Sequence, residues 1–175
     1  MTVSTRVTSA SPSTSPSALT SAFTEAMSRL ASGVAVVSTR RDDGAPCGLL
    51  VSSLCSYSAR PPSVLVSIAR DARSCQVLAD GAEFGVHLLG RGDEALAAVF
   101  AGRGEDKFAE AAWSWDGPVP RIAGTCAYLR CAPSAAFGHG DHVVVIGEVV
   151  RCDLGGDDPL VYYRRSLGWR LAGEP

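Results

Sequence analysis

The spacing of apolar residues along the chain predicts a mainly β fold interrupted by short helices. Three segments have apolar residues at helical spacing, and a glycine follows each of them closely. Ser17 is a candidate N-cap for the first helix, Gly33 closes it, and Ser74 is a candidate N-cap for the second. The three predicted helices span residues 18–32, 74–78 and 93–100.

Apolar runs bounded by turn residues predict the strands. The segment Arg41-Asp42-Asp43-Gly44 joins the first two strands as a hairpin, with glycine where a left-handed backbone is needed. Arg60-Pro61-Pro62 interrupts the pattern, and residues 109–120, with Trp113 and Trp115, are predicted to be irregular. The predicted strands span residues 34–39, 47–53, 64–68, 84–89, 126–132, 142–152 and 160–163.

The order of these elements predicts the topology. Strands follow one another as hairpins, without a regular alternation of strand and helix, and this order favours an antiparallel sheet closed into a barrel. Residues 1–16 are mostly Thr, Ser, Pro and Ala, so we expect a disordered leader before a single domain at residues 17–175. No glycine cluster completes G-x-G-x-x-G, so a Rossmann-type nucleotide site is not expected.

Composition narrows the classes of function. The 175 residues are 46% hydrophobic and 19% charged, with a formal net charge of −2 at pH 7. These values fit a globular domain without the clustered basic excess of a nucleic-acid-binding protein, and no apolar run is long enough to span a membrane. We therefore expect neither a nucleic acid nor a membrane as a partner.

The six cysteines form no C-x-x-C pair, and residues 1–18 lack the apolar segment of a signal peptide. We therefore expect reduced cysteines in a cytoplasmic protein. A zinc site built from Cys126, Cys131, His139 and His142 is an alternative, although its spacing matches no standard zinc pattern.

The segment Gly138-His139-Gly140-Asp141-His142 is the strongest candidate for chemistry. Two histidines and an aspartate lie between glycines at the start of the apolar run 143–146. A turn that directs polar side chains from the end of a core strand is a common way to build a site. A solvated surface hairpin is the alternative interpretation.

Three further features accompany this turn. A strand within residues 48–56 ends in small hydroxyl residues, which leave backbone groups free to meet a planar polar ring. Residues 67–74 place arginine and serine at the predicted start of a helix, where a phosphate can bind. The third feature is Phe100-Ala101-Gly102 followed by Lys107-Phe108. A serine-rich edge and an ordinary helix cap explain the first two as well.

In this order and at these spacings, the chain resembles the flavin reductases of two-component flavin-dependent monooxygenases, short-chain members of the FMN-binding split-barrel family. The resemblance extends from Phe23 to Arg165 and includes residues 27–39, which look like the family's junction of helix and first strand. It implies an antiparallel split β-barrel that forms a homodimer and uses NADH or NADPH to reduce FAD or FMN. It also implies a separate monooxygenase that receives the reduced flavin.

The resemblance also implies site residues. His142 matches the histidine of the family's Gly-Asp-His motif, close to the nicotinamide, and is the candidate catalytic residue. The residues matched to the segment along the flavin ring are Pro46, Cys47, Gly48, Leu49, Leu50, Ser52, Ser53, Leu54 and Cys55. Lys107 and Phe108 match a Lys-Phe pair that contacts the flavin, and Lys107 with Arg73 is expected to supply most of the charge for its phosphate. Those matched to the ribityl and phosphate loop are Ser67, Ile68, Ala69, Arg70, Asp71, Ala72, Arg73 and Ser74. Those matched to the dinucleotide are Tyr163, Arg164, Arg165 and Ser166.

Hydride transfer from a dihydronicotinamide to a flavin needs no metal and no protein nucleophile, so we expect the chain to position two rings. The sequence departs from the family at Leu49 and Leu50, where Thr or Ala is frequent, and at Leu167, where an aromatic residue is frequent. Two alternatives stay open: a split-barrel oxidase of the pyridoxamine-phosphate-oxidase type, and a non-enzymatic flavin or haem carrier.

Overall fold

A computed structural model describes residues 15–104, 106–156 and 158–171 of the chain. The leader expected at residues 1–16 therefore lies almost wholly outside the described residues. Its last two residues begin the first helix, because the backbone N–H of Ala18 donates to the Oγ of Ser15 at 3.3 Å. The N-cap is thus Ser15 rather than Ser17, and Pro16 follows it, where its missing N–H leaves no helical hydrogen bond unmade.

The described residues form three helices and twelve strands. The helices are α1 (Pro16–Ser28), α2 (Cys75–Ala79) and α3 (Glu94–Ala101), each close to a predicted helix. The strands are β1 (Ser32–Gly33), β2 (Ala35–Arg40), β3 (Pro46–Val51), β4 (Leu54–Ala59), β5 (Pro62–Ala69), β6 (Phe84–Leu88), β7 (Trp113–Asp116), β8 (Val119–Ile122), β9 (Ala127–His139), β10 (His142–Leu154), β11 (Val161–Tyr163) and β12 (Ser166–Trp169).

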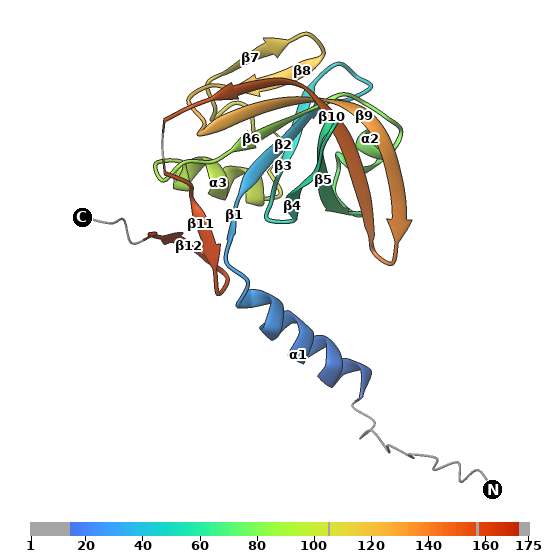
Figure 1. Cartoon of the computed structure of the whole chain (residues 1–175), viewed down its shortest axis with the longest axis vertical. Coiled ribbons are helices and arrows are strands. Elements are labelled where there is room, and N and C mark those ends of the chain that lie inside the picture. The colour runs from blue at the N-terminus through green and yellow to red at the C-terminus, as the bar shows by residue number, and fades with distance from the viewer. Residues whose placement is uncertain (1–14, 105, 157, 172–175) are drawn as a thin grey trace, which may run out of the picture.

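Seven strands form one antiparallel sheet in the order β3-β2-β6-β9-β10-β5-β4, which confirms the predicted mainly β, antiparallel fold (Figure 1). The order joins strands that are distant in sequence. Strand β10 pairs with β5, with His142 opposite Ala69, and β6 pairs with β9, with Phe84 opposite Cys131. Strands β3 and β4 are the two edges of the sheet.

The sheet wraps around one apolar core. Residues from near both edges, such as Val51 of β3 and Val66 of β5, belong to the same buried cluster as Phe84 and Val145 from its centre. A sheet whose two ends bury one core is rolled into a barrel, and its unpaired edges leave the barrel split. This agrees with the predicted split β-barrel.

The residues around β2 also contribute to a second core outside the barrel. Val34 and Val36 belong to this second cluster, together with Phe100 of α3 and Phe108. Alternation of side chains along a strand explains this arrangement, because Ala35 and Val37 belong to the barrel core instead. The second core fixes α3 against β2 and β3, so the segment after α3 lies next to the sheet edge.

Four strand segments differ from the sequence predictions. The first helix ends at Ser28 instead of residue 32, and Ser32–Gly33 form β1. Residues 54–59, which are rich in serine, form the edge strand β4, and residues 166–169 form β12. Residues 113–122 form the β7–β8 hairpin, so the irregular segment predicted at residues 109–120 is wrong. These strands lie at edges or in a small separate sheet, where the apolar pattern is weakest.

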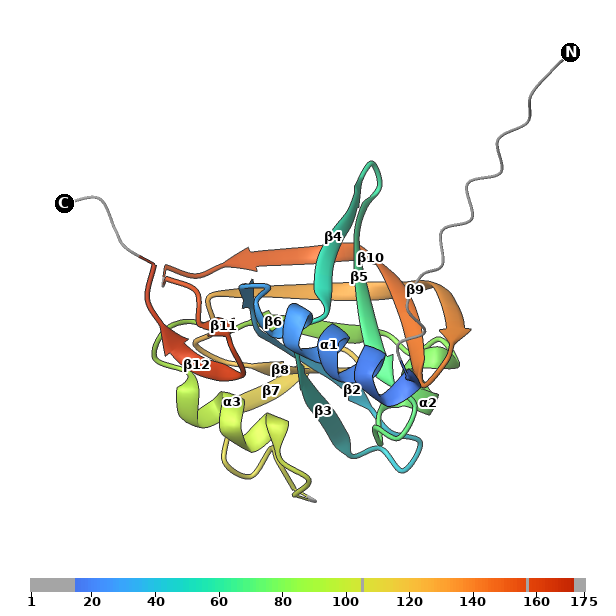
Figure 2. The same cartoon turned by 90° about the horizontal axis from the view of Figure 1, so that it is seen from below.

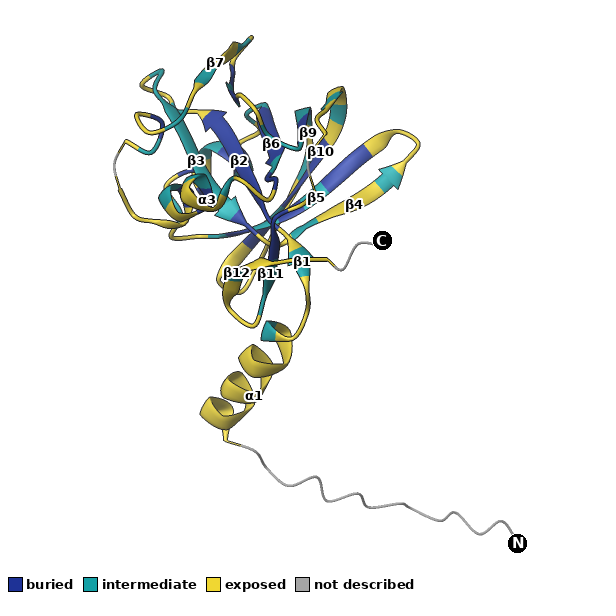
Figure 3. Cartoon of the chain, turned by 90° about the vertical axis from the view of Figure 1, so that its left-hand side faces the viewer, coloured by how far each residue is buried: buried dark blue, intermediate teal, exposed yellow. Residues whose placement is uncertain are grey.

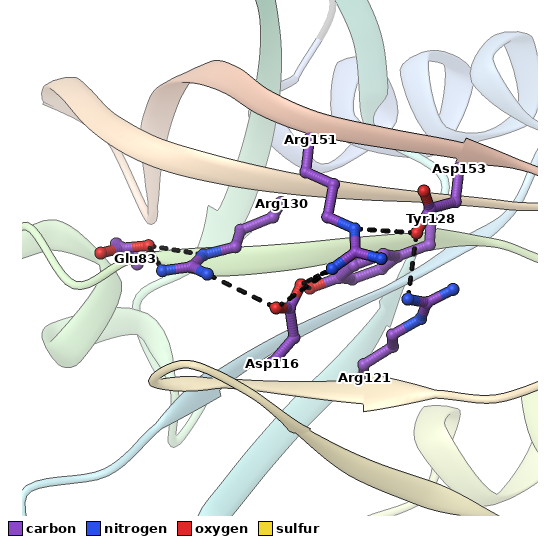
Figure 4. Close-up of polar contacts among 7 residues, drawn as sticks. All are labelled: Glu83, Asp116, Arg121, Tyr128, Arg130, Arg151 and Asp153. Carbon is purple, nitrogen blue, oxygen red and sulfur yellow. Dashed lines mark hydrogen bonds and ion pairs between the residues drawn. The ribbon is translucent and has the colours of Figure 1, made fainter.

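Ion pairs attach the β7–β8 hairpin to the main sheet. The carboxylate of Asp116, at the end of β7, accepts from the hydroxyl of Tyr128 at 3.1 Å and from the guanidinium groups of Arg130 at 3.5 Å and Arg151 at 3.4 Å. Arg130 also pairs with Glu83 at 2.8 Å. Figure 4 shows this network, in which Asp116 is the shared acceptor.

Helix α1 extends away from the barrel (Figures 1 and 3). It contains no buried residue, and its neighbour in the fold is the turn between β11 and β12, where the backbone N–H of Arg164 donates to the carbonyl of Ser28 at 2.8 Å. Within the described ranges, no helix is both long and apolar enough to cross a bilayer.

Candidate functional site

A cleft of about 560 Å³ lies between the edge strand β3, the loop before α2 and the segment after α3. Because β3 pairs with β2 alone, the backbone donors and acceptors of its other edge have no strand partner. The residues that line the cleft are Arg41, Pro46, Cys47, Gly48, Leu49, Leu50, Asp71, Ala72, Arg73, Ser74, Phe100, Ala101, Gly102, Arg103, Gly104, Lys107 and Phe108. Three of the segments predicted from the sequence, 46–50, 71–74 and 107–108, therefore meet at one place.

The cleft is lined by four cationic side chains and one carboxylate, that of Asp71. Lys107 is half-buried, and its Nζ donates to the carbonyl of Phe100 at 2.8 Å and lies 3.4 Å from that of Gly48. Burial first, and then the positive charge of Arg73, lower the pKa of the Lys107 ammonium below its usual value. An anion in the cleft would relieve this repulsion.

Arg73 lies across the cleft from the sheet edge. Its guanidinium donates to the carbonyls of Arg103, at 2.7 Å, and Gly104. These contacts join the loop before α2 to the segment after α3. Sequence reasoning missed Arg41 and Arg103, because each resembles an ordinary solvated surface charge in a turn.

Two of the predicted cleft residues, Phe108 and Ser74, are buried and a third, Cys47, is partly buried, which limits what they can do. The ring of Phe108 packs edge-to-face on Phe100 with centroids 5.1 Å apart, so it belongs to the second core as well as to the cleft wall. Ser74 is 2% exposed. Burial raises the pKa of the Cys47 thiol to about 11, so this cysteine stays protonated and is not a nucleophile at neutral pH.

A second, shallower cleft of about 490 Å³ adjoins the first, and both are lined by Leu50 and Ala101. Its lining residues are Val34, Leu50, Val51, Ser52, Ala101, Tyr162, Arg165, Ser166 and Leu167. It brings Ser52 together with Arg165 and Ser166 of the predicted dinucleotide segment.

The other two residues of that segment have partners within the chain. Tyr163 packs edge-to-face on Trp169 with centroids 5.2 Å apart, and Arg164 lies 5.5 Å from the centre of the Tyr163 ring. Arg165 pairs with Glu25 of α1 at 3.5 Å. The turn between β11 and β12 is therefore bound to α1 as well as open to the second cleft.

His142 lies at the start of β10, and its backbone pairs with Ala69 and His139 on the two neighbouring strands. Its Nδ1 is 2.8 Å from a carboxylate oxygen of Asp141, as the sequence predicts for an oriented imidazole. This hydrogen bond lowers the pKa of the Asp141 carboxyl. His142 is exposed and lines neither of the two clefts described here, although the loop that begins after Ala69 leads directly into the first.

The remaining predicted residues lie around the β4–β5 pair and not in either cleft. Ser53 Oγ donates to the carbonyl of Ser67 at 2.6 Å, and Ile68 is buried in the barrel core. Leu54 packs partly buried against the same core, while Cys55 is exposed on β4. Ala69 pairs with His142, and Arg70 contacts the β9–β10 turn rather than the cleft.

The positions of the cysteines and histidines support neither a zinc site nor a set of disulfides. Over the described ranges, no three His, Cys, Asp or Glu side chains come together in a way that could hold a metal ion. All six cysteines lie in the described part of the chain, and no disulfide joins any two of them.

Comparisons with known proteins agree with this architecture. The model of the flavin reductase like domain matches residues 27–169. A flavin reductase (NADH) of Kitasatospora aureofaciens is 40% identical over 158 residues, covering 85% of this chain and 81% of that protein. The reductase component of 4-hydroxyphenylacetate 3-monooxygenase of Thermus thermophilus is 36% identical over 141 residues, covering 80% of this chain and 89% of that protein.

Comparison with a solved structure also points to a flavin reductase fold. An NADH:FAD oxidoreductase of Streptomyces globisporus, in complex with NAD and FAD fragments, superposes with a TM-score of 0.79 and 29% identity. The superposition covers 86% of this chain and 91% of that one. Since the family match spans most of the barrel and both clefts, the chain belongs to the family of flavin reductase like domains.

Proposed function

We propose that the chain is an oxidoreductase that uses NADH to reduce a free flavin, FAD or FMN, and supplies the reduced flavin to a separate monooxygenase. The main support for this proposal is the cationic cleft along the unpaired edge of the sheet. All of its lining residues lie within residues 27–169, which match the flavin reductase like domain. The relatives named as NADH-dependent flavin reductases and as reductase components of monooxygenases support the same activity.

The residues of the first cleft suit a flavin. Backbone groups of β3 without a strand partner offer donors and acceptors to the polar edge of a planar ring, and Leu49 and Leu50 offer apolar surface. Arg73 and Lys107 supply positive charge for a phosphate, which guanidinium and ammonium groups bind well, whereas Arg41 already pairs with Asp43 at 2.7 Å. The volume of about 560 Å³ is within the usual range for a site of this kind.

The two substrates supply the redox chemistry, and the protein positions them. The reduced nicotinamide supplies a hydride and the flavin ring accepts it. The protein holds the flavin and the nicotinamide nucleotide within reach of each other. The cations of the first cleft bind the flavin phosphate. Leu50 and Ala101 form the wall that the first cleft shares with the second. In this proposal the second cleft and His142 receive the nicotinamide nucleotide.

NADH rather than NADPH fits the charges near the second cleft. A 2′-phosphate needs a cation that is free to bind it. Arg165 already pairs with Glu25 and donates to the carbonyl of Thr24 at 3.3 Å, while Arg164 lies over Tyr163. We therefore expect NADPH to be the poorer reductant.

Steady-state consumption of NADH and NADPH without oxygen, each with FAD and with FMN, tests the activity. We expect rapid oxidation of NADH that depends on added flavin. Flavin binding without oxidation of either nucleotide would favour the flavin-carrier alternative. Turnover of another small substrate without free flavin would favour the oxidase alternative.

A homodimer and a cytoplasmic location also belong to this proposal. Leu19, Phe23 and Met27 recur at every fourth position of α1, on one face, and are 62%, 60% and 47% exposed. An isolated helix of this length is marginal in water, so a second copy of the chain is the expected cover for this face. Light scattering should give a dimer mass for the wild type and for Ser21→Asp, and a monomer mass for Phe23→Asp. A monomeric wild type would contradict the proposal.

A further inference from the structure

We propose that Arg70 is a positioning residue that fixes the β9–β10 turn and, through it, the imidazole of His142. This inference rests on the proposed function, in which His142 receives the nicotinamide. The resemblance to flavin reductases instead grouped Arg70 with the residues that bind the ribityl chain and phosphate of the flavin.

The hydrogen bonds of Arg70 connect it to the β9–β10 turn. It is the first residue after β5, and its Nε donates to the carbonyl of Gly140 at 3.1 Å. Its backbone N–H donates to the carbonyl of Asp141 at 2.9 Å. Both residues that immediately precede His142 are thus held at position 70: Gly140 by the guanidinium, and Asp141 by the backbone N–H, which does not depend on the side chain. Arg70 does not line the cationic cleft, whereas Arg73, three residues later, does.

Gly138 gives an independent indication that the guanidinium rests on this turn. A Cβ added at Gly138 would collide with Nη2 of Arg70, and Cζ would lie 3.3 Å away. Glycine at this position therefore leaves room for the guanidinium to lie over the end of β9. The arginine covers one strand end and binds the turn that follows it, so the turn cannot shift without losing these contacts.

The link to His142 is short. His142 pairs with Ala69 across β10 and β5, and its Nδ1 bonds to Asp141, whose own carbonyl accepts from Arg70. The side chains of Asp141 and His142 are 95% and 47% exposed, so burial does little to fix the carboxylate. The hydrogen bond from the Arg70 side chain to the Gly140 carbonyl adds the rigidity that this exposed pair needs to hold its position, beyond what the backbone N–H at position 70 supplies.

The test is a double-mutant cycle between Arg70→Ala and His142→Ala, with NADH kinetics measured using FMN or riboflavin as the acceptor. We expect Arg70→Ala to lower kcat/KM for NADH by roughly tenfold, the scale of one hydrogen bond from a charged group. The loss should be the same with FMN and riboflavin, and the KM for flavin should not change. In the His142→Ala background, Arg70→Ala should have no further effect, because it acts through that histidine.

Two further variants distinguish the proposed effect of Arg70→Ala from a general loss of folding. Gly138→Ala keeps Arg70 but displaces its guanidinium, and should reproduce the loss in kcat/KM for NADH. Arg60→Ala, in the turn between β4 and β5, is the matched control and should leave the kinetics unchanged. Figure 2 shows that this turn lies at the end of β5 remote from α2. Hydrogen exchange of residues 138–142 should accelerate in Arg70→Ala and Gly138→Ala, and not in Arg60→Ala.

Three results would overturn the inference. Effects that multiply in the double variant would mean that Arg70 acts apart from His142. A loss with FMN and not with riboflavin would mean that Arg70 binds the flavin phosphate. If His142→Ala slows NADH turnover and Arg70→Ala does not, the inference alone fails; if neither slows it, the proposed role of His142 fails as well.

Discussion

Acidification is expected to destabilise the protein through one buried histidine, His87. Its side chain is 0% exposed, stacks on the ring of Tyr128 with centroids 5.0 Å apart, and lies 3.0 Å by its Nε2 from Ser38 Oγ. The single hydroxyl hydrogen of Ser38 is donated to the carbonyl of Pro120 at 2.6 Å. Nε2 must therefore carry the imidazole hydrogen, and the buried Nδ1 is left without a donor or acceptor in the described structure.

The size of the expected loss in stability follows from the pKa of His87. Burial lowers the pKa of His87 to about 4, from an ordinary value of 6.5, because the charged imidazolium would lose its hydration. Between these two values the unfolded chain binds a proton that the folded chain does not bind. The free energy of unfolding therefore falls as the pH falls through 6.5, by about 2 kcal/mol between pH 7.5 and pH 5, and levels off below pH 4.

Urea unfolding at a series of pH values measures this slope. The variant His87→Gln keeps an amide donor for Ser38 and does not titrate, so its stability should change much less between pH 7.5 and pH 5. The carboxyl groups of Asp43 and Asp141, whose pKa values are lowered, lose their contributions only at more acidic pH. Equal slopes for the wild type and His87→Gln would refute the reasoning, since the proton uptake would then belong to another group.

The remaining predictions concern the cleft and the sheet. Lys107→Met should weaken binding of FMN by about tenfold and of riboflavin much less, as titration calorimetry would show; equal losses would mean that Lys107 does not bind phosphate. Asp116→Asn should lower the free energy of unfolding by about 1–3 kcal/mol, because Arg130 and Arg151 lose a shared carboxylate; an unchanged urea midpoint would contradict this. Flavin should be lost on dialysis, because it is a substrate, and retention of one flavin per chain would contradict that.

The sequence was enough to predict the elements that bury apolar side chains with a clear period. Val34–Val37 alternates between two cores, and the run Val143–Ile146 follows the glycine-rich turn as predicted. Strands β4 and β7 were not predicted, for physical reasons. Serine-rich β4 is an edge that buries little, and β7 is held by ion pairs from Asp116 to residues far away in sequence.

The candidate site was predicted in part. The predicted segments 46–50 and 71–74 line one cleft, because the edge of the sheet faces the loop before α2. Sequence alone cannot tell where neighbouring arginines point. Arg70 and Arg73 lie three residues apart, yet one binds the carbonyl of Gly140 and the other that of Arg103. Their direction depends on where β5 ends, which is set by its pairing with β10.

The central claim is that the chain reduces flavin as a substrate and releases it. The most direct measurement is anaerobic bleaching of oxidised flavin by NADH, with flavin in large molar excess over the chain. With NADH in excess, we expect all of the flavin to be reduced, over many turnovers of each chain. Bleaching that stops after one equivalent of flavin per chain, or none at all, would contradict it.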